Sequence, residues 1–260
     1  MTTNKAMMSK PKASHIYSKR PLKINDLRFL YYCLFCLLMG CADALCFRYE
    51  WPWSRLIIRL IIFLFLIGWL IRNSPYAFSQ RNIMIMISMS FTHIYPAWSN
   101  IFQHQILEYY LMMILPNVGF LFLLTAFRLE NLKIKDKGFF HFFRFLFIFI
   151  FLPVLFSYFV LYPHIVESPY LPLHVAYFCS LVGVFYYGME VNFCRESKSL
   201  VFASMAVMAI TNIAISYYSF VEHPDWWVEL TILLALLSRV LLFYGLAIED
   251  QYRKSREFLH

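Results

Sequence analysis

The chain has 260 residues, of which 61% are hydrophobic and 15% are charged, and it carries a formal net charge of +8. Soluble domains are about half apolar and a quarter charged, so this composition excludes an ordinary soluble fold. Uncharged runs at 60–71, 111–127 and 146–162 are typical of membrane-spanning helices and lack the alternation of a membrane β-strand. The sequence therefore predicts an all-α, multi-pass integral membrane protein.

Eight apolar segments follow one another along the chain. A transmembrane helix needs about 20 predominantly apolar residues. The segments that approach this length are, in chain order, 27–47, 55–71, 82–99, 106–127, 139–161, 172–189, 199–221 and 226–248. They predict a bundle of about eight transmembrane helices over residues 27–248, with a basic cytoplasmic tail at 1–26 and a cytoplasmic C-terminal tail at 249–260.

The loops between these segments differ in charge. If both termini are cytoplasmic, most of the 23 Lys and Arg residues lie on the cytoplasmic side, whereas Glu167, Glu222 and Asp225 fall at outer loops. Lys and Arg resist translocation, so this asymmetry predicts an even number of spans with both ends inside. Basic residues at the cytoplasmic face attract anionic lipid headgroups, each by about 1 kcal/mol. We therefore expect membrane lipids, and no nucleic acid, as partners. A bacterial inner membrane and a eukaryotic endomembrane or plasma membrane fit equally.

Polar side chains at membrane depth are the candidates for function, because hydrocarbon excludes them. At 1.5 Å of rise per residue, those near the middle of their predicted spans are His93, Asn117, Thr211, Asn212 and Arg239. An isolated arginine at this depth costs at least about 2.5–3.5 kcal/mol on insertion scales, so Arg239 should have a partner. Asp43, the one acidic residue well inside a predicted span, is the leading candidate for that partner. Arg59 lies closer to a helix end, where its side chain is expected to reach water.

These polar residues also have a purely structural interpretation. Asn212 shares a helix face with Ser216 and Ser219, and such side chains in membrane helices often hydrogen-bond to a neighbouring helix. Pro116, beside Asn117, frees a backbone carbonyl one turn earlier, and helices interrupted in this way tend to line cavities. The common depth of polar residues from four spans is what favours a shared polar pocket.

Motifs of soluble enzymes are missing from the sequence. It contains no G-x-S-x-G, H-E-x-x-H or P-loop pattern. Of its six cysteines, four fall within one apolar segment, where they are typical of small buried residues. We therefore expect no metal and no cofactor.

Two segments in the last predicted spans match a known pattern with substituted residues. In ITNIAISYYSF, at 210–220, Thr211 and Asn212 stand where the pattern has a Ser-Asp pair. In SRVLLFYG, at 238–245, Ser238 and Arg239 stand where it has an Ala-Gln pair, before an apolar stretch and a glycine.

Two earlier spans contain the corresponding sites. A Gly-Asp pair of the third span is replaced by Thr92-His93, and an Ala-His pair of the fourth span by Pro116-Asn117. With these four segments the chain resembles the lysoplasmalogenase family, which are eight-helix membrane hydrolases acting on the vinyl-ether bond of lysoplasmalogens.

The resemblance implies hydrolysis of a lysophospholipid in an intramembrane polar pocket. One group would protonate the alkene carbon and another would help water add to the resulting cation. His93 would donate the proton, since imidazole exchanges protons near neutral pH, and Asn212 would orient the water. The ligand would be bound by Thr211, Asn117, Arg239 and Asp43, with Arg239 on its phosphate. Because His93 and Asn212 replace the acidic pair of the family, lipid binding without cleavage is the alternative.

Two rival functions follow from other features of the sequence. The polar tail at 249–260 would, as a continuation of the last helix, dock a protein partner and make the chain a non-catalytic sensor or interaction protein. Asp43 and Arg239 would instead serve as a charge relay in a small transporter, although the sequence lacks the matched halves common in transporters.

Overall fold

The protein is helical throughout the part of the chain that the computed structural model describes, which is residues 26–94, 105–130, 143, 151, 154–155, 157–165, 171–220 and 226–257. Every regular element in these ranges is a helix and none is a strand, which confirms the predicted all-α class. The elements are α1 (Asp26–Arg48), α2 (Pro52–Asn73), α3 (Gln80–Met89), η1 (Ser90–Ile94), α5 (Gln105–Arg128), η3 (Ser157–Leu161), α8 (Tyr162–Ile165), α9 (Leu171–Glu190), α10 (Arg195–Phe220) and α11 (Trp227–Glu257).

Five of the described helices are long and apolar enough to cross a membrane, namely α1, α2, α9, α10 and α11. A shorter apolar stretch, Ile114–Arg128, belongs to α5. The predicted third segment corresponds to α3 with η1, whereas most of the predicted fifth segment, 139–161, lies outside the described residues. These helices are those of an integral membrane protein; the count of eight spans and the orientation of the termini stay predictions.

The outer surface and the core of the bundle both carry apolar side chains. Leu66, Leu70 and Phe243 are completely buried between the helices, whereas Leu64 and Leu237 are exposed. A soluble protein covers such side chains, but a helix in lipid presents them to the hydrocarbon without cost. The exposed leucines therefore agree with a membrane environment.

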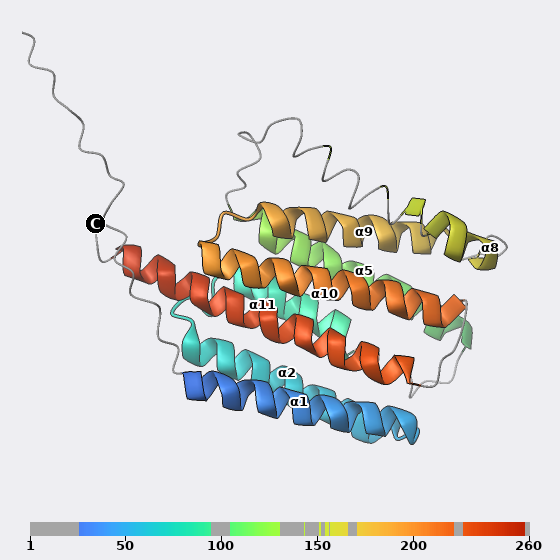
Figure 1. The fold of residues 1–260 in the computed structure, drawn as a ribbon, viewed down its shortest axis with the longest axis horizontal. Helices are drawn as coiled ribbons and strands as arrows, with labels where there is room; N and C mark the ends of the chain where they lie inside the picture. The colour runs from blue at the N-terminus through green and yellow to red at the C-terminus, as the bar shows by residue number, and fades with distance from the viewer. Residues whose placement is uncertain are drawn as a thin grey trace, which may run out of the picture.

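α11 is the central helix of the described bundle. In Figure 1 it lies between α10 on one side and the pair α1 and α2 on the other, with α5 and α9 beyond α10. Ser204 Oγ of α10 donates a hydrogen bond to the Ser238 carbonyl of α11 at 2.7 Å, and Ser197 Oγ donates to the Gly245 carbonyl at 2.7 Å. A Cβ on Gly245 would lie 3.1 Å from the Val201 side chain, so the glycine permits this close approach.

α11 continues through residue 248, where the sequence predicts the start of a tail, as far as Glu257. Its side chains Glu249 and Asp250 are almost completely buried at one end of the bundle. Arg81 of α3 pairs there with Asp250, and its Nη1 also lies 3.1 Å from Glu130 Oε1 beyond α5. The first residues of the expected tail therefore pack against the chain's own helices.

A second arginine completes this cluster, which we call the ionic network (Arg81, Glu130, Glu249, Asp250 and Arg253). Arg253 Nε lies 3.0 Å from Glu249 Oε1, and its guanidinium also pairs with Glu130. The ionic network joins α3, the residues after α5 and α11, so it fixes the register of these helices at one end of the bundle.

Candidate functional site

Asp43 of α1 is held by two arginines of α2. Arg55 Nε donates to Asp43 Oδ1 at 3.1 Å, and Arg59 Nε donates to Asp43 Oδ2 at 2.9 Å. The two arginines are four residues apart and therefore share one face of α2. All three side chains are buried, with Asp43 only 2% exposed. The carboxylate thus has both oxygens occupied by charge-assisted hydrogen bonds, which are the strong kind.

Two guanidinium groups from different helices end on consecutive backbone carbonyls of η1. Arg59 Nη1 donates to the His93 carbonyl at 3.0 Å, and Arg239 Nη2 of α11 donates to the Thr92 carbonyl at 2.8 Å. η1 is a π-helical segment, a rare form that is often found at functional sites. Helices α2 and α11 thereby contact η1 through arginine side chains, and α1 is linked to them through Asp43.

The ring of His93 is buried beside these arginines. The residue is 2% exposed, and neither Nδ1 nor Nε2 has a hydrogen-bond partner among the described residues. A neutral imidazole offers one donor and one acceptor. Leaving a buried polar group unsatisfied costs about 1–3 kcal/mol, so the ring is suited to a ligand that supplies hydrogen-bonding groups.

The charges of this site do not balance. We call it the arginine cluster (Asp43, Arg55, Arg59, His93 and Arg239); within these residues three guanidinium groups face one carboxylate. Arg55 is also placed 4.6 Å from the centroid of the Phe47 ring, a cation–π contact that stabilises one of the positive charges. Positive charge in excess of its counter-charge is unfavourable away from water, and an anion reduces this cost.

Asp43 is not the direct hydrogen-bond partner of Arg239 that the sequence predicts. Asp43 hydrogen-bonds Arg55 and Arg59, whereas Arg239 hydrogen-bonds the Thr92 carbonyl. The expectation that Arg59 reaches water is wrong, because Arg59 is only 7% exposed. Its side chain points inward because Asp43 pairs with the guanidinium and so takes the place of the water that would otherwise solvate it.

Asn212 and Thr211 have partners away from the arginine cluster. Asn212 Nδ2 donates to the Met208 carbonyl at 2.6 Å, and its Oδ1 accepts from the Tyr177 hydroxyl of α9. Thr211 Oγ1 donates to the Val207 carbonyl of its own helix at 2.7 Å. These hydrogen bonds agree with the structural interpretation of the polar face of α10, and they link it to α9.

Asn117 lies on α5, near the point where that helix meets η1. It is partly buried, and Pro116 beside it lies inside a helix that is assigned without interruption from Gln105 to Arg128. Two residues further on, a Cβ on Gly119 would lie 2.7 Å from Thr92 Cγ2. α5 therefore packs closely on the segment that carries the two carbonyls of the arginine cluster.

Sequence reasoning missed Arg55 and Arg59 as members of the site. Their spacing of four residues on an apolar helix was a usable signal, because two cations on one face of a span require a shared counter-charge. Because the connection between α1 and α2 is short, α2 runs back alongside α1. This brings Arg55 and Arg59 next to Asp43, which precedes them by 12 and 16 residues in the sequence.

Comparison with known proteins adds no family to this description. A scan against protein-family models found no match, and searches of curated proteins and of solved structures found no significant similarity. The fold and the site define the class of the protein, which is a helical protein with several membrane-type helices and a buried arginine cluster.

Proposed function

We propose that this multi-pass membrane protein, with eight spans and both termini cytoplasmic, binds the phosphate group of a lysophospholipid at the arginine cluster. The observation that carries this proposal is the excess of guanidinium over carboxylate around the buried ring of His93. Phosphate is an anion that arginine recognises well, because its oxygens match the planar fork of N–H groups.

The roles of the side chains differ. One Nη2–H of Arg239 is used by the Thr92 carbonyl, which aims the guanidinium and leaves further N–H groups for a phosphate. Arg55 and Arg59 are already held by Asp43, so we assign them and Asp43 to positioning. His93 supplies one donor and one acceptor, which suits the free glycerol hydroxyl next to the phosphate of a lysophospholipid.

The binding proposal is tested with lysophosphatidic acid added to the purified protein in detergent, followed by native mass spectrometry. We expect saturable binding, reduced about tenfold or more in Arg239→Gln, because a charge-assisted hydrogen-bond pair is lost. Arg239→Lys keeps the charge but not the fork and should have an intermediate affinity. Arg128→Gln removes an exposed charge at the end of α5 and serves as the control. Equal affinity in Arg239→Gln and wild type would refute the proposal.

Hydrolysis of the vinyl-ether bond is the second candidate function, favoured by the buried ring of His93, whose nitrogens have no partner among the described residues. In this reaction a proton adds to the alkene carbon, water adds to the oxocarbenium carbon, and the hemiacetal breaks down to an aldehyde and the glycerol hydroxyl. The test is aldehyde release from a lysoplasmalogen. Release that is lost in His93→Ala supports the hydrolase, and no release from wild type, with binding retained, leaves a binding protein.

A further inference from the structure

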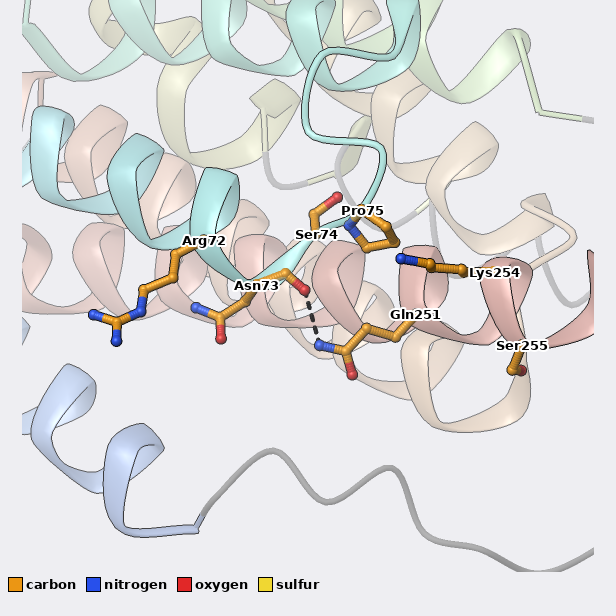
Figure 2. A pocket seen from close by; sticks show the side chains of 7 residues that line it. All are labelled: Arg72, Asn73, Ser74, Pro75, Gln251, Lys254 and Ser255. Atoms are coloured by element: carbon orange, nitrogen blue, oxygen red, sulfur yellow. Dashed lines mark hydrogen bonds between the residues drawn. The ribbon is translucent and has the colours of Figure 1, made fainter. Parts of the chain in front are cut away.

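A cavity at the end of the bundle opposite to the arginine cluster is the strongest unassigned feature of the molecule. It has a volume of about 500 Å³ and lies between the end of α2 and the last turns of α11. It is lined by Arg72, Asn73, Ser74, Pro75, Gln251, Lys254 and Ser255. Figure 2 shows these side chains, with Arg72 from the end of α2 and Lys254 from α11 on either side of Asn73 and Gln251.

Arg72 and Lys254 form no ion pair with any residue that the structure describes. Both are exposed, and neither pairs with a carboxylate of the described residues. Two acidic side chains of α11 lie near Lys254 in sequence. Glu257 accepts a hydrogen bond from the Tyr76 hydroxyl, and Asp250 pairs with Arg81 within the ionic network and also accepts hydrogen bonds from Ser74 and Asn82. Within the described part of the chain, the cavity is therefore bordered by two positive charges that are in no ion pair, beside the Asp250 carboxylate, which is already paired.

Two backbone carbonyls at the end of α2, beside the cavity, accept side-chain hydrogen bonds. The Asn73 carbonyl at the end of α2 accepts a hydrogen bond from Gln251 Nε2 at 2.8 Å, drawn as a dashed line in Figure 2. The Trp69 carbonyl accepts from Asn73 Nδ2 at 2.8 Å. The C-terminal end of a helix carries about half a negative charge, which opposes an anion. Two full positive charges outweigh it, and the capped carbonyls reduce it further.

We propose that this cavity is a second, independent anion site that binds a phosphate group at the end of the membrane domain. The shared chemistry is a phosphate held between a guanidinium and an ammonium group, on a phospholipid headgroup or on a soluble phosphate ester. Its position at the ends of two membrane-type helices places a bound phosphate at headgroup level.

The experiment is native mass spectrometry of the full chain with phosphatidylglycerol, phosphatidylcholine or glycerol 3-phosphate as probe. We expect one tightly retained phosphatidylglycerol molecule, and we expect its affinity to fall about tenfold or more in Arg72→Gln/Lys254→Gln. The matched control is Arg128→Gln/Arg195→Gln, which removes two exposed charges from the same end of the bundle and should retain the lipid. Displacement of the lipid by glycerol 3-phosphate would assign the site to soluble phosphate esters.

Two results would overturn the proposal. One is unchanged retention of every phosphate probe in Arg72→Gln/Lys254→Gln. The other is an equal loss in the control pair, which would indicate a diffuse surface charge and no built site. Since all four side chains are exposed, an unchanged melting temperature is expected for both variants and shows that each has folded. Binding of lysophosphatidic acid at the arginine cluster is expected to be unaffected, which separates this site from the first.

Discussion

Arg59 links Asp43 of α1 to the backbone of η1, because its Nε donates to the carboxylate at 2.9 Å and its Nη1 donates to the His93 carbonyl at 3.0 Å. One guanidinium thereby fixes three segments of the chain relative to one another. A change in the Asp43–Arg59 ion pair should therefore also affect the position of η1.

Replacement of Arg59 by glutamine should destabilise the protein. Breaking a buried ion pair costs about 3–5 kcal/mol, and Asp43 keeps Arg55 as a partner, so we expect the lower end of this range. The measurement is the melting temperature in detergent. In a double-mutant cycle, Asp43→Asn combined with Arg59→Gln should cost less than the sum of the single changes. Strict additivity would show that the two side chains do not interact in the folded protein.

Gly119 and Gly68 offer a matched pair of substitutions. A Cβ on Gly119 would lie 2.7 Å from Thr92 Cγ2 and 3.1 Å from the Ser88 carbonyl, so Gly119→Ala must shift η1. We expect a loss of about 1–3 kcal/mol in stability together with weaker lysophosphatidic acid binding. A Cβ on Gly68 of α2 meets nothing within 4 Å, so Gly68→Ala should leave both properties intact or raise stability slightly. Equal effects of the two changes would contradict the close approach of α5 to η1.

Asp250 should be the most sensitive position of the ionic network. It is 1% exposed and accepts from Arg81, Ser74 and Asn82, so Asp250→Asn leaves a buried guanidinium with one carboxylate partner fewer. We expect a loss of about 3 kcal/mol or more, measured as a fall in melting temperature. The exposed Glu196 at the start of α10 provides the control, since Glu196→Gln should change stability by less than about 0.5 kcal/mol.

The thiol of Cys194, in the connection between α9 and α10, should react slowly near neutral pH. Burial raises the pKa of this thiol to about 11; the hydrogen bond with the Ser197 backbone opposes the rise and the neighbouring Glu249 carboxylate adds to it. A raised pKa means less thiolate, which is the reactive form. Alkylation by iodoacetamide, followed by mass spectrometry of the Cys194 peptide, should accelerate about tenfold per pH unit between pH 8 and 10. A rate that levels off below pH 9 would contradict this environment.

The sequence predicted the helices found among the described residues, because hydrocarbon imposes a length and a polarity on each span. The depth of the polar residues in the membrane stays a prediction. His93 and Arg239 were selected on that basis, and the structure connects both to one segment, η1. Depth along a helix does not determine rotation about its axis. Asn212, at a similar depth, turns toward Tyr177 of α9, and no described hydrogen bond links it to the arginine cluster.

The pairing of charges could not be predicted from depth either. Several arginines were possible partners of Asp43. The short α1–α2 connection places Arg55 and Arg59 beside it, so Asp43 pairs with these two and not with Arg239. Nor does a period in the sequence mark the π-helical form of η1, which exposes the Thr92 and His93 carbonyls to guanidinium groups. The continuation of α11 to Glu257 follows from buried partners of Glu249 and Asp250, since polar composition alone favours a tail at that point.

Whether Arg239 recognises the negative charge of a lipid ligand can be measured by comparing two lipids. The affinities of lysophosphatidic acid and of an uncharged monoacylglycerol with the same acyl chain are measured on wild type and on Arg239→Gln. We expect a preference for the phosphate-bearing lipid of about tenfold or more in wild type and almost none in Arg239→Gln. An equal preference in both proteins would contradict it.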